Sequence, residues 1–144
     1  MKKQSYSNHK RLVWWFHGIL FGLCLATLLG SIVNLLESMD GEGNLYSASL
    51  LVSCSVILMI LFFTVRFFGV RLQDRVIRAE ENIRHMSLTG KPLDNRLHMH
   101  QIIALRFAPD DEFVELCKSA VENHLSQEEI KKSIGRWKGD YHRI

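Results

Sequence analysis

The sequence has few residues that cross-link or rigidify small domains, with three cysteines and two prolines among 144 residues. Three cysteines without a recurring spacing exclude a disulfide framework, so we interpret Cys24, Cys54 and Cys117 as reduced side chains that pack among apolar neighbours. The chain also lacks a glycine-rich phosphate loop, a nucleophile elbow, a CxxC pair and a paired-carboxylate site. We therefore expect no enzymatic activity, no cofactor and no metal centre.

Charge is absent from two long stretches, residues 12–36 and 43–65, which hold most of the large apolar side chains. Each is long enough to cross about 30 Å of hydrocarbon, for which a helix needs roughly 20 residues. The first stretch is longer than the h-region of a cleaved signal peptide, about 7–15 residues, so we predict a retained span. The sequence thus indicates an all-α membrane protein, a hairpin with transmembrane helices over 12–36 and 48–68.

Basic residues are missing from the short loop between the spans, residues 37–47, which carries Glu37, Asp40 and Glu42. Lysine and arginine instead flank the outer ends of the spans, at Lys2, Lys3, Lys10, Arg11, Arg66, Arg71, Arg75 and Arg78. The positive-inside rule therefore places both termini, including the basic segment 1–11, in the cytoplasm and the acidic loop outside.

Small residues recur at every fourth position of the first span, at Gly18, Gly22, Ala26 and Gly30. On a helix this spacing makes a shallow groove along one side, which lets a second helix approach closely. Ser49 and Ser53 of the second span would meet the outer end of this groove in an antiparallel pair. We predict that these residues form either a tight hairpin or a contact between copies of the chain.

Two polar side chains, His17 and Asn34, interrupt the first span. Polar groups inside a membrane are candidates for ion or substrate pathways. His17 lies one turn from the inner boundary, however, and neither span holds an Asp or Glu that would complete a proton relay. A pathway lined by these two residues is the alternative to a purely structural span.

The chain beyond the second span is charged and keeps a helical spacing of apolar residues. A heptad-like seam with separations of 4, 3, 4 and 3 consists of Leu72, Val76, Ala79, Ile83 and Met86. We predict that the second helix continues over residues 69–88 as a rod and that this seam receives the helices that follow. A short coiled coil is the alternative use of the same seam.

Capping signals divide residues 89–144 into a small helical domain. Gly90 suits a left-handed cap at the end of the rod. Asp94 or Asn95 is then expected to cap a short helix that reaches about Phe107.

Two further helices follow in this domain. One is predicted to begin near Pro109, with an apolar face made of Phe113, Leu116, Cys117, Ala120, Val121 and His124. The last begins at a capping box of Ser126 and Glu129. Its apolar side is predicted to comprise Ile130, Ile134, Trp137 and Tyr141.

The segments "IIALRFA" and "SQEEIKKSIGRWK" resemble pieces of a sigma-factor-type helix-turn-helix. In that family the second piece follows the first within a few residues, whereas 21 residues lie between Phe107 and Glu129 here. The basic residues of the second piece, Lys131, Lys132, Arg136 and Lys138, are balanced by nearby acidic ones. We therefore expect these residues to face solvent or anionic lipid heads rather than nucleic acid.

The "HMH" sequence, with His98 and His100, resembles part of a metal site but lacks the spacing that one needs. On a helix, His98 and His100 would point about 200° apart, and neither His85 nor Cys117 supplies a third ligand at a diagnostic spacing. We interpret both histidines as surface residues.

Three longer segments, "RLQDRVIRAEENIR", "LHMHQIIALRFAPDDEF" and "LSQEEIKKSIGRWKGDYHRI", are similar to those of a known family. That family comprises small bacterial two-span membrane proteins of unknown function, some of them loosely labelled as ABC transporter permeases. A permease usually has more spans than this chain. The resemblance implies a bacterial inner-membrane setting and no particular mechanism.

The most direct functional prediction is a structural or interaction subunit of the inner membrane. Its expected partners are the lipid bilayer and either further copies of itself or another membrane protein; no small-molecule substrate is evident. A small oligomeric transporter or channel component, lined by His17 and Asn34, is the first alternative. A membrane-tethered DNA-binding regulator is the second.

Overall fold

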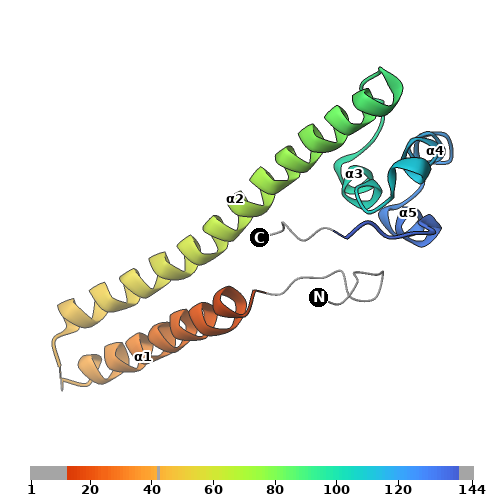
Figure 1. Cartoon of the computed structure of the whole chain (residues 1–144). Helices are drawn as coiled ribbons and strands as arrows, with labels where there is room; N and C mark the ends of the chain where they lie inside the picture. The colour runs from red at the N-terminus through yellow and green to blue at the C-terminus, as the bar shows by residue number, and fades with distance from the viewer. Residues whose placement is uncertain (1–12, 42, 140–144) are drawn as a thin grey trace. The chain divides into compact units, whose positions relative to one another are not determined.

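The structure is a computed structural model that describes residues 13–41 and 43–139 (Figure 1). All regular secondary structure in these residues is helical, which confirms the all-α class. The elements are a π-helix, η1 (Trp15–Leu20), and the α-helices α1 (Phe21–Met39), α2 (Leu45–Thr89), α3 (Met99–Leu105), α4 (Asp110–Glu122) and α5 (Gln127–Ser133). Six residues named above lie outside the described part of the chain: Lys2, Lys3, Lys10, Arg11, Glu42 and Tyr141. The first position of the predicted first span, residue 12, lies outside it as well.

The chain divides into two compact units, each described by itself. Of the described residues, 13–69 form one unit and 70–139 form the other. Helix α2 contributes its first part to the former, here called the N-terminal unit, and its second part to the latter, the C-terminal unit. Two helices are long and apolar enough to cross a membrane, Trp15–Met39 with 25 residues and Leu45–Thr89 with 45.

In the N-terminal unit, α1 lies antiparallel beside the first part of α2 (Figure 1). The buried residues along the two helices recur every seven positions: Cys24, Ser31, Ser38, Ala48, Ser55 and Phe62. The hydroxyl of Ser55 donates to that of Ser31 over 3.1 Å, and the rings of Phe16 and Phe62 stack with centroids 4.4 Å apart. A heptad period with small residues is how two helices pack closely along a continuous line.

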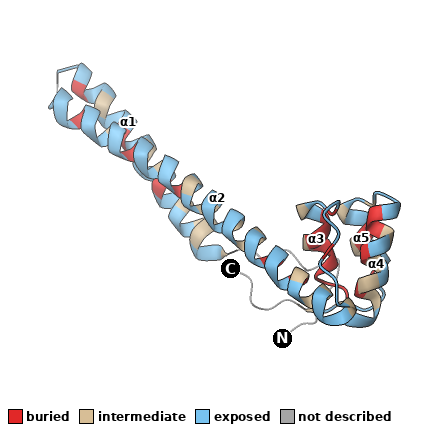
Figure 2. Cartoon of the chain, turned by 90° about the horizontal axis from the view of Figure 1, so that it is seen from above, coloured by how far each residue is buried: buried red, intermediate tan, exposed pale blue. Residues whose placement is uncertain are grey.

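In the C-terminal unit, α3, α4 and α5 enclose an apolar core (Figure 2). Its largest fully buried side chains are Phe107, Phe113, Leu97, Ile102, Leu105 and Ile130. The predicted rod is confirmed, because α2 continues to Thr89 and ends at Gly90. Gly90 has a φ of 71° and donates its N–H to the carbonyl of Met86 over 2.8 Å, as a left-handed cap requires.

Two predicted helix boundaries in this unit are wrong. The expected cap of α3 was Asp94 or Asn95, but its N-cap is His98, three or four residues later. Asp94 instead accepts from the N–H of Arg96 in a turn. Helix α5 ends at Ser133 instead of continuing to Trp137. Beyond it, Glu112 of α4 accepts the N–H groups of Gly135 and Arg136, which holds this stretch out of a helix.

The face that the rod presents to the core also differs from the prediction. Ile77 and Glu81 are the buried residues of this part of α2, and Arg84 of the same side reaches the turn before α4. All five residues of the predicted seam, from Leu72 to Met86, are exposed. The expectation that the following helices cover the seam is therefore wrong, because they pack on the opposite side of the rod.

Candidate functional site

The stripe of small residues does not form the contact between α1 and α2 within the chain. Gly22, Ala26 and Gly30 are exposed, and a Cβ atom added at Gly22 or Gly30 would meet nothing within 4 Å. Ser49 and Ser53 are also exposed, with their hydroxyls bonded to carbonyls of their own helix. The hairpin version of the prediction is corrected accordingly, since the serine-rich heptad seam makes that contact.

Gly18 differs from the other stripe residues, because it is half-buried within η1. A Cβ atom there would lie 3.1 Å from the ring of Trp14. Gly18 thus makes room for an aromatic side chain of its own helix. The exposed groove consists of Gly22, Ala26 and Gly30, which we call the α1 groove; it lies on the side of α1 turned away from the heptad seam.

His17 and Asn34 are not brought together by the structure. They lie at opposite ends of the first span, on the order of 25 Å apart at 1.5 Å per residue. The Nδ1 atom of His17 is 3.0 Å from the carbonyl oxygen of Val13, a bond that the Nδ1–H tautomer donates. Asn34 is exposed. The hydrogen bond of His17 stays within its own helix, which is how a structural histidine near a helix start behaves.

The "LRF" segment lies in the core of the C-terminal unit. Leu105 is fully buried, Phe107 is 1% exposed, and Ala104 and Ala108 beside them are fully buried. The ring of Phe107 packs on that of Trp137 with centroids 4.9 Å apart, and its carbonyl accepts the N–H of Lys138 over 2.8 Å. This segment therefore contributes to the core of the domain, and these four side chains are not available as a surface for nucleic-acid recognition.

The basic stretch after α5 pairs with the acidic start of α4. Arg136 forms an ion pair with Asp111, and Glu112 accepts from the N–H groups of Gly135 and Arg136 over 2.9 and 3.1 Å. Acidic residues in the first turn also suit the positive end of a helix dipole. Part of the positive charge that suggested nucleic-acid contact is thus neutralised inside the domain.

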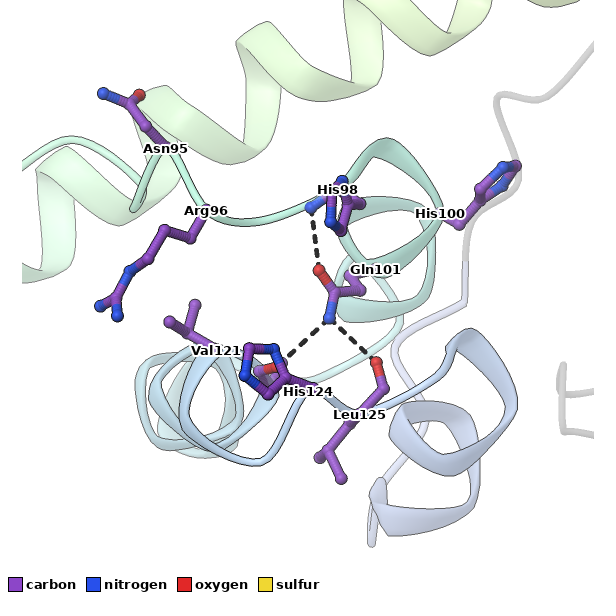
Figure 3. Close-up of a pocket in the computed structure, with 9 residues that line it drawn as sticks. Asn95, Arg96, His98, His100, Gln101, Val121, His124 and Leu125 are labelled. Atoms are coloured by element: carbon purple, nitrogen blue, oxygen red, sulfur yellow. Dashed lines mark hydrogen bonds between the residues drawn. The ribbon is translucent and has the colours of Figure 1, made fainter.

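A hollow of about 690 Å³ opens between the start of α3 and the end of α4 (Figure 3). Three histidines line it, His98, His100 and His124. All three are exposed, and Figure 3 shows the rings of His98 and His100 pointing in different directions. No group of three metal-ligating side chains is close enough to hold an ion in the described part of the chain.

The wall of this hollow is fixed by Gln101, which is 8% exposed. Its amide donates to the carbonyls of Ala120 and Leu125 over 3.2 and 2.9 Å, and its oxygen accepts the N–H of His98 over 2.8 Å. Figure 3 shows the bond to His98 closing the start of α3, while the other two join α3 to α4 and to the turn after it. Sequence reasoning missed Gln101, although a Gln three residues after a helix N-cap is a recognised capping signal.

The arginine at the rim of the hollow is already paired. Arg96 holds the carboxylate of Asp94 with N–O distances of 2.7 to 3.2 Å, which lowers the pKa of Asp94 to about 2 and raises that of Arg96. Both side chains are exposed, so solvent screens this pair. Arg96 therefore offers little uncompensated charge to a ligand in the hollow.

Arg84 makes several side-chain contacts within the C-terminal unit. It donates to Glu81 over 3.0 Å, to Asp110 over 2.7 Å and to the carbonyl of Ala108 over 2.7 Å. Its guanidinium lies 4.2 Å from the centre of the Phe113 ring, a cation–π distance. Arg84 also holds the pKa of Asp110 below its ordinary value through the hydrogen bond between them. These contacts join the rod to α4, and no pattern in the sequence had singled out Arg84.

The thiol of Cys117 is expected to be unreactive in the folded chain. Burial raises its pKa from 9.0 to about 12, with a smaller contribution from Glu81, so the thiolate fraction at pH 8 falls about a thousandfold. In a chain with Cys24→Ala and Cys54→Ser, maleimide is expected to modify Cys117 only after denaturation. The matched control places the thiol on exposed Lys118, as Lys118→Cys with Cys117→Ala, and this variant should react at once. Equal rates for the two folded variants would contradict the burial of Cys117.

Comparison with known proteins places the chain in a family. A model for a family of unknown function, DUF6526, matches residues 1–144, the whole chain. No curated protein and no solved structure matches it. This confirms the resemblance to a family of unknown function that the sequence motifs indicated. The chain belongs to the DUF6526 family of unknown function.

Proposed function

We propose that the chain is a small subunit of the bacterial inner membrane that associates with further copies of itself through the α1 groove. In this proposal η1–α1 and the first part of α2 cross the bilayer as a hairpin, with both termini in the cytoplasm. The C-terminal unit is then a cytoplasmic domain. The observation that carries the proposal is the exposure of Gly22, Ala26 and Gly30 along one side of α1.

The membrane setting is supported by what the two long helices expose. Within their most apolar windows only 6% and 17% of residues are buried. Side chains such as Leu23, Ile57 and Phe63 are more than half exposed. A soluble protein rarely shows apolar surface of this extent, whereas lipid is a suitable solvent for it. The acidic loop and the basic residues after the second span support the orientation.

Self-association is supported by the shape of the α1 groove. Helices in lipid gain little from apolar burial alone, so they pack where small residues let their backbones approach. The contact with α2 uses a different side of α1, which leaves this groove available. A second copy brings an identical groove in the same orientation, and two such grooves fit each other.

The test measures energy transfer between donor- and acceptor-labelled full-length chains in lipid vesicles. Replacing both Gly22 and Gly30 with leucine fills the groove and is expected to weaken association about tenfold or more. Thr27→Leu adds bulk at another exposed position of α1 and serves as the matched control, with association expected to be unchanged. Wild-type chains that remain monomeric in the vesicles would overturn the proposal.

A further inference from the structure

The second part of α2 carries an apolar face that its own domain leaves uncovered. Leu72, Val76, Ile83 and Met86 are 64%, 48%, 67% and 47% exposed, and Ala79 between them is exposed as well. These five residues, called the rod seam, belong to the charged, C-terminal unit, where water rather than lipid is the expected solvent. A contiguous apolar stripe facing water indicates an interaction surface.

The C-terminal domain packs against the other side of the rod. Ile77 belongs to the apolar core and Glu81 is buried, while Arg84 donates to Asp110 at the start of α4 and to Ala108 in the turn before it. At 3.6 residues per turn this face lies nearly opposite the rod seam. The helices α3, α4 and α5 therefore leave the seam open to a partner along its whole length. Figure 2 colours most of this part of α2 as exposed.

The residues of the rod seam fit a parallel, two-stranded coiled coil. With Val76 and Ile83 at the a positions, the d positions are Leu72, Ala79 and Met86. Branched residues at a, with unbranched or leucine side chains at d, favour two parallel strands. We infer that the rod seam forms a parallel coiled coil with the rod seam of a second copy of this chain.

Charges that flank the seam point to a second copy as the occupant. In this register Arg75 takes a g position and Glu80 takes the e position five residues later. Parallel coiled coils pair g of one helix with this e of the other, so Arg75 of each copy faces Glu80 of its partner. The pairing occurs twice by symmetry, and both residues are exposed and thus available for it.

The inference rests on the proposed function in one respect, since it needs two copies inserted in the membrane with the same orientation. It uses different residues, however, and a different helix. About two heptads are too short to join two free chains strongly. Confinement to one membrane raises the effective concentration of the second rod, and a contact in the spans raises it further. A seam of about two heptads next to a membrane is therefore long enough to form a coiled coil between two copies.

Cysteine cross-linking in isolated membranes tests the contact directly. In the full-length chain with Cys54→Ser, Ala79→Cys places a thiol at the centre of the seam, while Cys24 and Cys117 stay buried. A short bis-maleimide is expected to link Ala79→Cys into dimers. Arg78→Cys, exposed on the next residue but turned away from the seam, is the matched control and should give at least fivefold fewer dimers.

Charge reversal then tests the pairing of Arg75 with Glu80. Arg75→Glu or Glu80→Arg alone turns two attractive contacts into repulsive ones and is expected to lower the dimer yield of Ala79→Cys roughly fivefold at low salt. The double variant should restore the yield, and about 1 M salt should abolish the differences by screening. Circular dichroism checks that each variant keeps its helical content.

The outcomes separate this inference from the proposed function. Energy transfer between wild-type chains together with no cross-link at Ala79→Cys would overturn the coiled coil and leave self-association standing. Equal cross-linking at positions 78 and 79 would show random collision and overturn the coiled coil too. Cross-linking at Ala79→Cys that survives Gly22→Leu with Gly30→Leu would support the coiled coil and remove the α1 groove as the main contact.

Discussion

Replacing Arg84 with alanine is expected to destabilise the C-terminal domain by about 3–5 kcal/mol. The side chains of Arg84 and Glu81 are only 12% and 11% exposed, so the loss of the arginine leaves a carboxylate that water cannot fully solvate. The carbonyl of Ala108 loses its donor at the same time, and the ring of Phe113 loses the cation above it. These losses fall on the joint between the rod and α4.

The accessibility of Cys117 to maleimide measures this effect in the full-length chain. Labelling at increasing urea concentration reports the unfolding of the domain without interference from the spans. Arg78→Ala, which removes an exposed arginine six residues earlier on the rod, is the control and should change stability by less than about 0.5 kcal/mol. An Arg84→Ala variant as stable as this control would contradict the structural role of the pair.

The double replacement Glu81→Leu with Arg84→Met separates two causes of the stability loss in Arg84→Ala. One is the unpaired buried charge left on Glu81, and the other is the lost attraction of the ion pair. Apolar residues of similar size often replace a buried pair with little cost, because the desolvation of two charges offsets their attraction. We expect the double variant to recover most of the stability lost in Arg84→Ala. The contribution of Asp110, which is 62% exposed, is small by comparison. Since the pKa of Asp110 is lowered in the fold, its share is present at neutral pH and is lost as the pH falls below its ordinary value of 3.8.

Local signals in the sequence predicted the local features of the fold. The capping box is present, because Ser126 accepts the N–H of Glu129 and the carboxylate of Glu129 accepts the N–H of Ser126. Gly90 ends the rod as its conformational freedom suggested. Both features depend on residues within a few positions of each other, so periodicity and residue type determine them.

Features that depend on residues far apart in the chain could not be predicted from local sequence patterns. Helix α5 ends early because Glu112, more than 20 residues away in the chain, accepts the N–H groups that follow it. A heptad pattern shows that a seam exists but not whether the seam meets its own domain or another chain. The serine seam of the spans was missed for a related reason, since Ser31 and Ser55 interrupt the apolar pattern while the glycines of the α1 groove stand out.

The second large effect is expected for Phe107→Ala, at about 3–5 kcal/mol of lost stability. The side chain is 1% exposed, and its removal opens a cavity beneath Trp137 and between α3 and α5. The backbone bond from Lys138 to residue 107 ties the last described stretch of chain to the same point, so that stretch is expected to loosen as well. Urea-dependent labelling of Cys117 again measures the loss.

This substitution also decides how the "LRF" segment is to be understood. Phe107→Leu keeps an apolar side chain and should lose only about 1–2 kcal/mol, while Lys132→Ala, on the exposed face of α5, should change stability by less than about 0.5 kcal/mol. If the segment were a DNA-recognition helix, the opposite result would be expected. Replacing the surface cations would then weaken binding to duplex DNA, and replacing Phe107 would have little effect. Stability that follows the burial of Phe107 thus assigns the segment to the core, which directs the search for partners to the rod seam and the α1 groove.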